Sequence, residues 1–243
     1  MDNDDRQVGH LLTRREALTA LGAAGALVLL RCSSGSSSPT NDTLPACVVR
    51  PEQTEGPYFV DEVLNRSDIR SDPTTGAVRP GVPLDLTFHV SRVAEAACAP
   101  LAGALIDVWH CDHLGVYSDV VDPRFDTVGQ KFLRGYQVTD DYGVARFTTV
   151  FPGWYQGRTV HIHFKIRSAP EAAPGYEFTS QLYFDDELTD RIHALDPYSE
   201  KGERTRRNAD DGIYGRGGSQ LTLDTTRRGD DLTAAFEIAL QLA

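Results

Sequence analysis

The sequence has few basic residues, a single methionine and no hydrophobic run long enough to cross a membrane. Its 24 lysines and arginines stand against 35 aspartates and glutamates, which gives a net charge of −11. Because binding to a nucleic acid needs a basic face, we expect no nucleic-acid partner. The uncharged segment 17–30 covers only about 21 Å as a helix, against the roughly 30 Å of a bilayer core.

The rest of the composition favours a globular all-β domain. Hydrophobic residues make up 40% and charged residues 24% of the chain, proportions that exclude disorder and collagen-like repeats. The 21 glycines and 13 prolines indicate many turns between short strands. We therefore expect one domain with a substantial core.

The amino-terminal residues resemble an export signal. Arg14 and Arg15 precede the uncharged segment, and this order predicts a twin-arginine signal peptide over residues 1–32. The alternative interpretation is an ordinary buried helix that follows an arginine pair. The first interpretation predicts a protein exported by the twin-arginine route.

The segment after the signal predicts where the folded domain begins. Cys32 resembles the lipidated cysteine of bacterial lipoproteins, although Arg31 stands where that pattern has a small residue. The Ser/Gly-rich residues 33–43 predict a linker, and residues 44–243 the domain. The expected location is the periplasm, the outside of the cell or its surface. A lipid on Cys32 is the only membrane contact that we expect.

Three cysteines belong to the predicted domain: Cys47, Cys98 and Cys111. None has the close spacing of a thiolate zinc site, so we interpret them as structural. Two of them can pair in an oxidising compartment. All three pairings remain open.

Hydrophobic patterning predicts a β-sandwich of mostly antiparallel strands with long loops and one or two short helices. The predicted strands lie at residues 84–90, 104–111, 135–139, 144–150, 160–167, 180–184 and 232–242. A helix is predicted at residues 186–195 with Asp185 as its amino-terminal cap. Residues 200–231 carry many charges and glycines and predict a long surface loop.

A pair of histidines lies on one face of a predicted strand. His161 and His163 alternate with Val160, Ile162 and Phe164. Strand geometry puts both imidazoles on the same side, about 7 Å apart at Cα, so both can reach one metal ion. The alternative is two histidines that face solvent.

Two tyrosines lie close to this pair in the sequence. Tyr155 precedes His161 by six residues, and Tyr117 follows the predicted strand 104–111. A phenol with a pKa of about 10 is a poor ligand for most divalent ions, because its ionisation at neutral pH requires a strongly charged centre. Ferric iron is such a centre.

Four segments resemble, in the same order, those of the intradiol ring-cleavage dioxygenases. The resemblance covers about residues 47–190 and is greatest to an exported branch related to the catechol and protocatechuate enzymes. The segments are 54–59 (TEGPYF), 108–118 (VWHCDHLGVYS), 151–163 (FPGWYQGRTVHIH) and 180–184 (SQLYF).

The resemblance implies an enzyme that inserts both atoms of O2 into a catechol-type diol and produces a muconate-type diacid. The implied cofactor is one non-haem Fe(III), and the implied partners are a small catechol and O2. The implied metal ligands are Tyr117, Tyr155, His161 and His163; the implied catalytic residues are Arg158, Tyr155 and Gln181; the implied substrate-binding residues are Tyr58, Trp154, Arg158 and Gln181. The particular catechol and the oligomeric state remain open.

Charge balance supports this ligand set. One Fe(III), two tyrosinates and one hydroxide sum to zero charge, which suits a site in a low-dielectric pocket. A His-based copper or zinc site of the cupin type predicts a carboxylate four or five residues after His163, where Arg167 and Ser168 stand. A non-catalytic transthyretin-like binding module is the other alternative, and it gives no reason for the two tyrosines.

Overall fold

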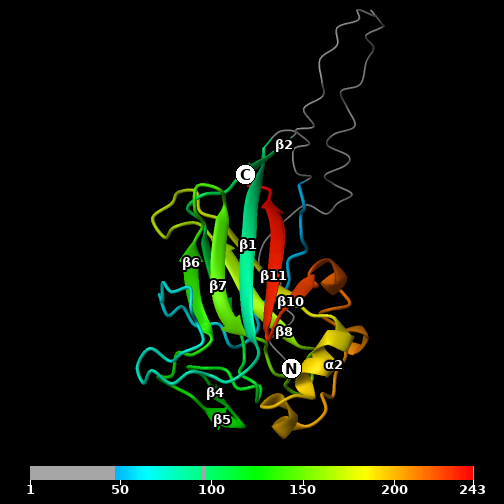
Figure 1. The fold of residues 1–243 in the computed structure, drawn as a ribbon. Coiled ribbons are helices and arrows are strands. Elements are labelled where there is room, and N and C mark those ends of the chain that lie inside the picture. The colour runs from blue at the N-terminus through cyan, green and yellow to red at the C-terminus, as the bar shows by residue number, and fades with distance from the viewer. Residues whose placement is uncertain (1–46, 95–96, 243) are drawn as a thin grey trace, which may run out of the picture.

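The structure is a computed structural model that describes residues 47–94 and 97–242, and these residues form two packed β-sheets (Figure 1). The first sheet contains β10 (Thr225–Arg228), β11 (Asp231–Leu240), β1 (Pro83–Ala94) and β2 (Ala97–Pro100), with β7 (Val144–Val150) also paired to β1. The second contains β6 (Arg134–Val138), β3 (Leu105–Trp109), β8 (His161–Arg167) and β9 (Glu177–Tyr183). A small hairpin joins β4 (Val121–Asp122) to β5 (Phe125–Asp126). The predicted all-β sandwich is confirmed.

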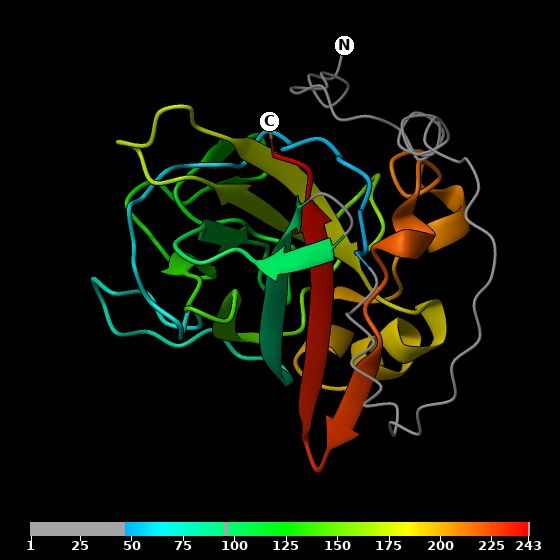
Figure 2. The same cartoon turned by 90° about the horizontal axis from the view of Figure 1, so that it is seen from above.

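Strand pairing is antiparallel except between β1 and β11, which run parallel side by side in both ribbon views (Figures 1 and 2). The register of that pair places Leu84 opposite Leu232 and Phe88 opposite Phe236. The mostly antiparallel arrangement agrees with the prediction. The parallel pair joins the start of the sandwich to its last strand.

The hydrophobic core lies between the two sheets. Phe88 of β1 and Phe164 of β8 are both fully buried, with ring centroids 5.4 Å apart. Phe236 of β11 contacts the same Phe164 ring at 5.4 Å. Because side chains alternate along a strand, the odd-numbered residues of β8 lie on the face directed away from this core.

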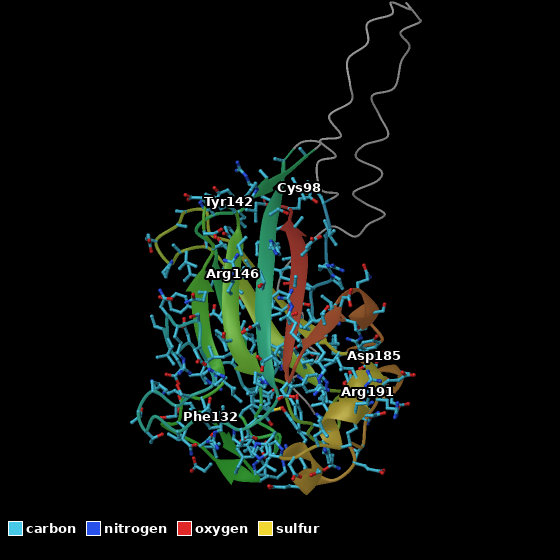
Figure 3. The ribbon with its side chains drawn as sticks, in the orientation of Figure 1. Cys98, Phe132, Tyr142, Arg146, Asp185 and Arg191 are labelled. Carbon is cyan, nitrogen blue, oxygen red and sulfur yellow. A yellow bond between two sulfur atoms is a disulfide. The ribbon has the colours of Figure 1, made fainter. Side chains whose placement is uncertain are left out.

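The helix α2 (Asp186–His193) follows β9. Figure 3 labels Arg191 within this helix and Asp185 directly before it. The side chain of Asp185 accepts a hydrogen bond of 2.9 Å from Leu188 N, which confirms the predicted cap. The helix ends two residues before the predicted end at residue 195. In the part of the chain that the structure describes, no helix has the length and hydropathy of a membrane span.

The predicted long loop at residues 200–231 is wrong in part. Three short 3-10 helices and β10 lie in this range. Residues 200–231, called the carboxyl-terminal segment below, lie beside α2 in both ribbon views (Figures 1 and 2). The 3-10 helices are η2 (Tyr198–Lys201), η3 (Asn208–Asp210) and η4 (Gly218–Gln220). Such short helices leave little periodicity in a sequence, and β10 depends on its pairing with β11.

A disulfide joins Cys47 to Cys98, with the Cα atoms 5.5 Å apart, while Cys111 is buried and free. The structure thus selects one of the three pairings that the sequence left open. Cys98 is labelled in Figure 3 on the short strand β2. The predicted signal peptide (1–32) and linker (33–43) lie outside the described residues.

Candidate metal centre

The two histidines of β8 lie on the outer face of the second sheet, and both are buried. The exposed fractions of His161 and His163 are 2% and 1%. Their Nε2 atoms are 2.9 Å apart. Two nitrogens that bind one ion at about 2.1 Å and at a right angle lie about 3.0 Å apart, so this separation fits a shared metal ion. The interpretation as solvent-facing histidines is wrong.

Two residues from other parts of the chain pack against the His163 ring, one from β3 and one from a segment far away in the sequence. Trp109, which lies opposite His163 in the sheet register, stacks on its ring with the centroids 5.0 Å apart and 9° between the planes. A Cβ atom at Gly56 would lie 3.1 Å from His163 Cε1, and the residue has a φ of +72°. A residue without a side chain is therefore needed here for the close approach.

The hydrogen bonds of His161 fix which nitrogen faces the cluster. Its Nδ1 donates to the carbonyl oxygen of Thr159 at 2.6 Å, so the Nε2 lone pair is directed at His163 and Tyr155. Burial, and then the positive charge of Arg158, hold the pKa of His161 well below its usual value. Burial and the neighbouring His161 do the same to the pKa of His163. Both rings are therefore neutral and able to bind a metal.

The two predicted tyrosine ligands join the histidines. Tyr155 Oη lies 3.2 Å from His161 Nε2. The ring of Tyr117 lies 5.8 Å from that of Tyr155 and 6.2 Å from that of His163, measured between centroids. Tyr117 is 1% exposed, and its buried Oη has no hydrogen-bond partner. An unpaired buried phenol oxygen aimed into such a cluster suggests a missing ligand.

A turn after β3 presents Tyr117. Asp112 Oδ1 accepts hydrogen bonds of 3.0 Å from both Leu114 N and Val116 N. Gly115 follows with a φ of +76°, and a Cβ atom there would lie 2.3 Å from the carbonyl oxygen of Trp154. The loop that carries Tyr117 therefore packs directly on the turn that precedes Tyr155.

Lys201 connects these same two loops. Its Nζ donates to the carbonyl oxygens of Leu114 and Trp154, the latter at 2.5 Å. It also lies 4.7 Å over the Trp154 ring. The first residues of the carboxyl-terminal segment thus hold the two tyrosine loops together.

The donor set fits a trivalent metal ion. Burial and the neighbouring Tyr155 raise the pKa of Tyr117 well above its ordinary value, and burial raises that of Tyr155 too. Such phenols ionise only beside a strong positive charge, which Fe(III) supplies. Within residues 47–94 and 97–242, no three His, Cys, Asp or Glu side chains gather as metal ligands do. A metal site here therefore depends on the tyrosines.

Tyr58 covers the cluster from the amino-terminal segment. Its ring stacks on Tyr117 at 4.4 Å and meets Tyr155 edge-on at 6.4 Å. Its Oη donates to Asp122 Oδ2 at 2.7 Å, in the β4–β5 hairpin. Burial and this acceptor raise the pKa of Tyr58 to about 12, so the phenol keeps its proton. The half-buried ring lies where the resemblance places a residue that lines the substrate pocket.

Arg158 and Gln181 also lie together at the site. Arg158 Nη2 donates to Gln181 Oε1 at 2.6 Å, and Tyr183 Oη donates to the same oxygen at 3.0 Å. Gln181 lies opposite His163 in the sheet register. Although burial disfavours its charge, Arg158 has a raised pKa because Tyr155 and other acidic groups surround it. Arg158 therefore supplies a fixed positive charge beside the tyrosine.

Trp154 and the nearby His110 have their polar atoms bound elsewhere in the protein. Trp154 packs against the main core, and its Nε1 donates to Gly202 O at 3.1 Å. The structure thus does not bring its indole into the cluster, although the resemblance implied contact with substrate. His110 has both ring nitrogens occupied, Nδ1 by Cys111 O at 2.9 Å and Nε2 by Thr149 Oγ1 at 2.7 Å.

The comparisons with known proteins agree with this geometry. A family model described as Dioxygenase matches residues 54–201, more than half of the chain. The chain belongs to the intradiol ring-cleavage dioxygenase family. It is 32% identical to a solved intradiol ring-cleavage dioxygenase from Tetranychus urticae, with a TM-score of 0.70, over 80% of this chain and 95% of that one.

More distant relatives share parts of the chain. A solved dioxygenase domain of a carbohydrate-binding fusion protein from Streptomyces sp. SirexAA-E is 28% identical, with a TM-score of 0.55, over 81% of this chain and 100% of that one. The catechol 1,2-dioxygenase of Candida albicans is 27% identical over 70% of this chain and 56% of its own length. A chlorocatechol 1,2-dioxygenase of Pseudomonas putida is 35% identical over 35% of this chain and 36% of its own. The chain thus spans from about a third to just over half of these curated relatives.

The sequence interpretation missed two residues that the structure places beside the site. Trp109 lies in one of the four resembling segments, but its stacking on His163 follows only from the register between β3 and β8. Asp211 was hidden in the predicted loop 200–231, yet its side chain reaches Arg158. A buried aspartate directly before a glycine turn leaves no signal that distinguishes it from a surface turn.

Proposed function

We propose that the protein is an intradiol dioxygenase that inserts both atoms of O2 into a catechol-type diol and forms a muconate-type diacid. One observation carries this proposal: two phenols and two neutral imidazoles converge, with Tyr155 Oη 3.2 Å from His161 Nε2 and the two histidine Nε2 atoms 2.9 Å apart. This set of donors is suited to Fe(III) and to few other ions.

The residues that would hold the iron are Tyr117, Tyr155, His161 and His163. When bound, mononuclear Fe(III) would draw electron density from a chelated catecholate and so make the ring reactive toward O2. The protein's part is to keep the four donors in place and water out. Trp109, stacked on His163, and the Thr159 carbonyl, which accepts from His161, fix the two rings.

A catechol must lose two protons to bind as a dianion, and Tyr155 is suited to accept one of them. It is partly exposed, while Tyr117 is 1% exposed, so Tyr155 has more room to turn away. Burial raises the pKa of Tyr155, so that its phenol is stable once protonated.

Arg158 and Gln181 act on the substrate. The guanidinium of Arg158 lies within reach of Tyr155 and carries the fixed charge that stabilises negative charge developing on the ring and on the attacking oxygen. Gln181, with its Oε1 held by Arg158 and Tyr183, keeps its polar end beside His163. Tyr58 offers an aromatic face against which a catechol ring can stack.

The purified protein tests this proposal. We expect about one iron per chain, a visible charge-transfer absorption that Tyr155→Phe alters, and a change of that absorption when catechol is added without oxygen. Oxygen uptake over a panel of catechols, with mass analysis of the products, identifies the substrate and the position of ring cleavage.

Four outcomes contradict the proposal. A colourless protein that holds zinc, or a copper protein with a different absorption, supports a His-based metalloprotein, and a colourless metal-free protein that binds aromatics supports a transthyretin-like module. Ring cleavage beside rather than between the two hydroxyls shows an extradiol enzyme. Native absorption in the His161→Ala, His163→Ala double variant contradicts the ligand assignment.

We also propose export by the twin-arginine route, to the periplasm, the outside of the cell or a lipid anchor on Cys32. The arginine pair Arg14 and Arg15 supports this location, and so does the Cys47–Cys98 disulfide, since disulfides persist mainly in oxidising compartments. Cell fractionation with immunodetection tests it. The native chain is expected in the exported fraction and the Arg14→Lys, Arg15→Lys variant inside the cell; equal export of both contradicts the proposal.

A further inference from the structure

One buried carboxylate at the edge of the site has no role in the proposed chemistry. Asp211 follows η3 and lies outside residues 54–201, the range that matches the family model. Its exposed fraction is only 3%, although it belongs to a segment rich in charged surface residues. A buried carboxylate needs partners that compensate for its lost hydration.

Four hydrogen bonds provide that compensation. Oδ2 accepts from Arg158 Nε at 2.9 Å and from Thr159 N at 2.8 Å. Oδ1 accepts from Ile213 N at 2.8 Å and from Tyr214 N at 3.0 Å. One oxygen thus binds Arg158 and Thr159, just before β8, and the other binds Ile213 and Tyr214 in the segment that follows η3. The carboxylate is fixed from both sides and has little freedom to move.

The partner of Asp211 is Arg158, the arginine that also binds Gln181. Arg158 is only partly exposed, and its guanidinium is held at two atoms: Nε by Asp211 and Nη2 by Gln181 at 2.6 Å. Two restraints on a planar group fix its orientation as well as its position. Without Asp211, the guanidinium could rotate about its contact with Gln181.

We propose that Asp211 is a positioning residue that fixes the Arg158 guanidinium beside Tyr155 through its ion pair with Nε. The inference rests on the proposed dioxygenase function and adds to it the residue that orients Arg158. The hydrogen bonds of the Asp211 carboxylate among the described residues go to Arg158, Thr159, Ile213 and Tyr214 and to none of the proposed metal ligands. Its effect therefore passes through Arg158 and through the Thr159 peptide, whose carbonyl holds His161.

The first test needs no iron and no activity. In the metal-free protein, the Arg158 Nε–H resonance, identified by its loss in Arg158→Gln, is expected to exchange slowly with solvent in NMR spectra. Asp211→Asn is expected to abolish this protection. The matched control is Asp210→Asn, because Asp210 is the exposed neighbouring carboxylate; it is expected to leave the protection unchanged. Equal protection in Asp211→Asn and the native protein would overturn the proposal.

The second test uses the iron-loaded enzyme. Asp211→Asn is expected to lower kcat about 10- to 100-fold, the scale of a displacement of about 1 Å, with KM changed less than about threefold. The visible absorption is expected to persist, because the metal ligands remain. On an Arg158→Gln background, Asp211→Asn is expected to have no further effect, whereas additive losses would show a purely structural role.

Two controls keep the outcomes distinguishable. If Asp211→Asn does not fold, Asp211→Glu keeps the charge but displaces the carboxylate by one methylene. It is expected to lower kcat while the protein stays folded, and native kcat in this variant contradicts the proposal. If the native protein holds iron but consumes no oxygen with any catechol, the proposed function fails; the NMR experiment still decides whether Asp211 orients Arg158.

Discussion

The two faces of β8 are equally buried, yet they do different work. Ile162, Phe164 and Ile166 on the inner face are 0% exposed and pack into the core. On the outer face, His161, His163 and Lys165 are 2%, 1% and 5% exposed. Burial alone therefore does not distinguish the core from the site. The outer face differs from the core in its polar side-chain atoms and in the hydrogen-bond and ion-pair partners of those atoms.

The outer face is itself divided. At one end, Lys165 forms ion pairs with Glu55 and Glu177, and Arg167 with Asp61 and Asp107. At the other end, the two histidine Nε2 atoms face each other, and the nearby Tyr117 Oη has no partner. At the paired end, the ion pairs of Lys165 and Arg167 cover the outer face of the sheet. The unpaired end is where the proposed metal ion would bind.

The largest expected effect comes from the unpaired end. The His161→Ala, His163→Ala variant removes two of the four proposed metal donors, so we expect loss of bound iron and a fall in oxygen uptake of about a thousandfold or more. The unfolding midpoint of the metal-free form should change little in comparison. Metal analysis and urea unfolding measure the two effects. The control His89→Ala changes an exposed histidine of β1 and should retain iron; iron loss there would show that the assay reports stability.

The inner face should give the opposite result. Phe164 is fully buried against Phe88, Phe178 and Phe236. Phe164→Ala is therefore expected to lower the free energy of unfolding by about 3–5 kcal/mol. Molecules that remain folded should still bind iron with native absorption. Tyr142→Ala, at an 80% exposed residue, should cost less than about 0.5 kcal/mol. If Phe164→Ala affects iron binding more than stability, the distinction between the inner core face and the outer metal-site face of β8 is wrong.

The sequence alone predicted which side chains lie on each face of β8, but not which residues pack over those faces. Strict alternation places His161 and His163 opposite the apolar residues, and the order of the motifs supplied Tyr117 and Tyr155. The cover is long-range, since Gly56 reaches His163 from more than a hundred residues away. The short distance between Gly56 and the His163 ring depends on how the whole chain packs, and no local sequence pattern predicts it.

The carboxyl-terminal segment shows the same limit more strongly. Asp211 lies 53 positions from Arg158, and its role depends on a contact between two loops. Its surroundings of charges and glycines resemble those of any exposed turn. The strand β10 is likewise visible only through its pairing with β11. Local periodicity predicts elements whose burial is periodic, and these residues have no such period.

His110 provides a buried histidine for comparison with the metal pair. Burial lowers its pKa from 6.5 to about 4, and both its nitrogens have hydrogen-bond partners. The unfolded chain binds a proton below about pH 6.5, while the folded protein does so only near pH 4. The neutral ring therefore contributes its full stability above pH 6.5, and about 3 kcal/mol is lost as the pH falls to 4.

His110→Gln tests this contribution. The stability of the native protein should fall more steeply between pH 6.5 and 4 than that of the variant, by about 3 kcal/mol over the interval. Urea unfolding at several pH values measures the difference between the two proteins. Parallel pH profiles would show that His110 is not the group responsible. Iron content at pH 7 should stay native, because His110 is not a metal ligand.

The smallest effect is expected at the paired end of the outer face. Glu177 is 51% exposed, and Lys165 keeps Glu55 as a second partner when Glu177 is changed. Because water screens such a pair, Glu177→Gln should lower the free energy of unfolding by less than about 1 kcal/mol and leave iron binding unchanged. Urea unfolding at low and high salt measures it, and the small difference should shrink as salt rises. A loss of iron in this variant would mean that the charged end of the face and the metal centre are coupled, and the division of the outer face would then have to be abandoned.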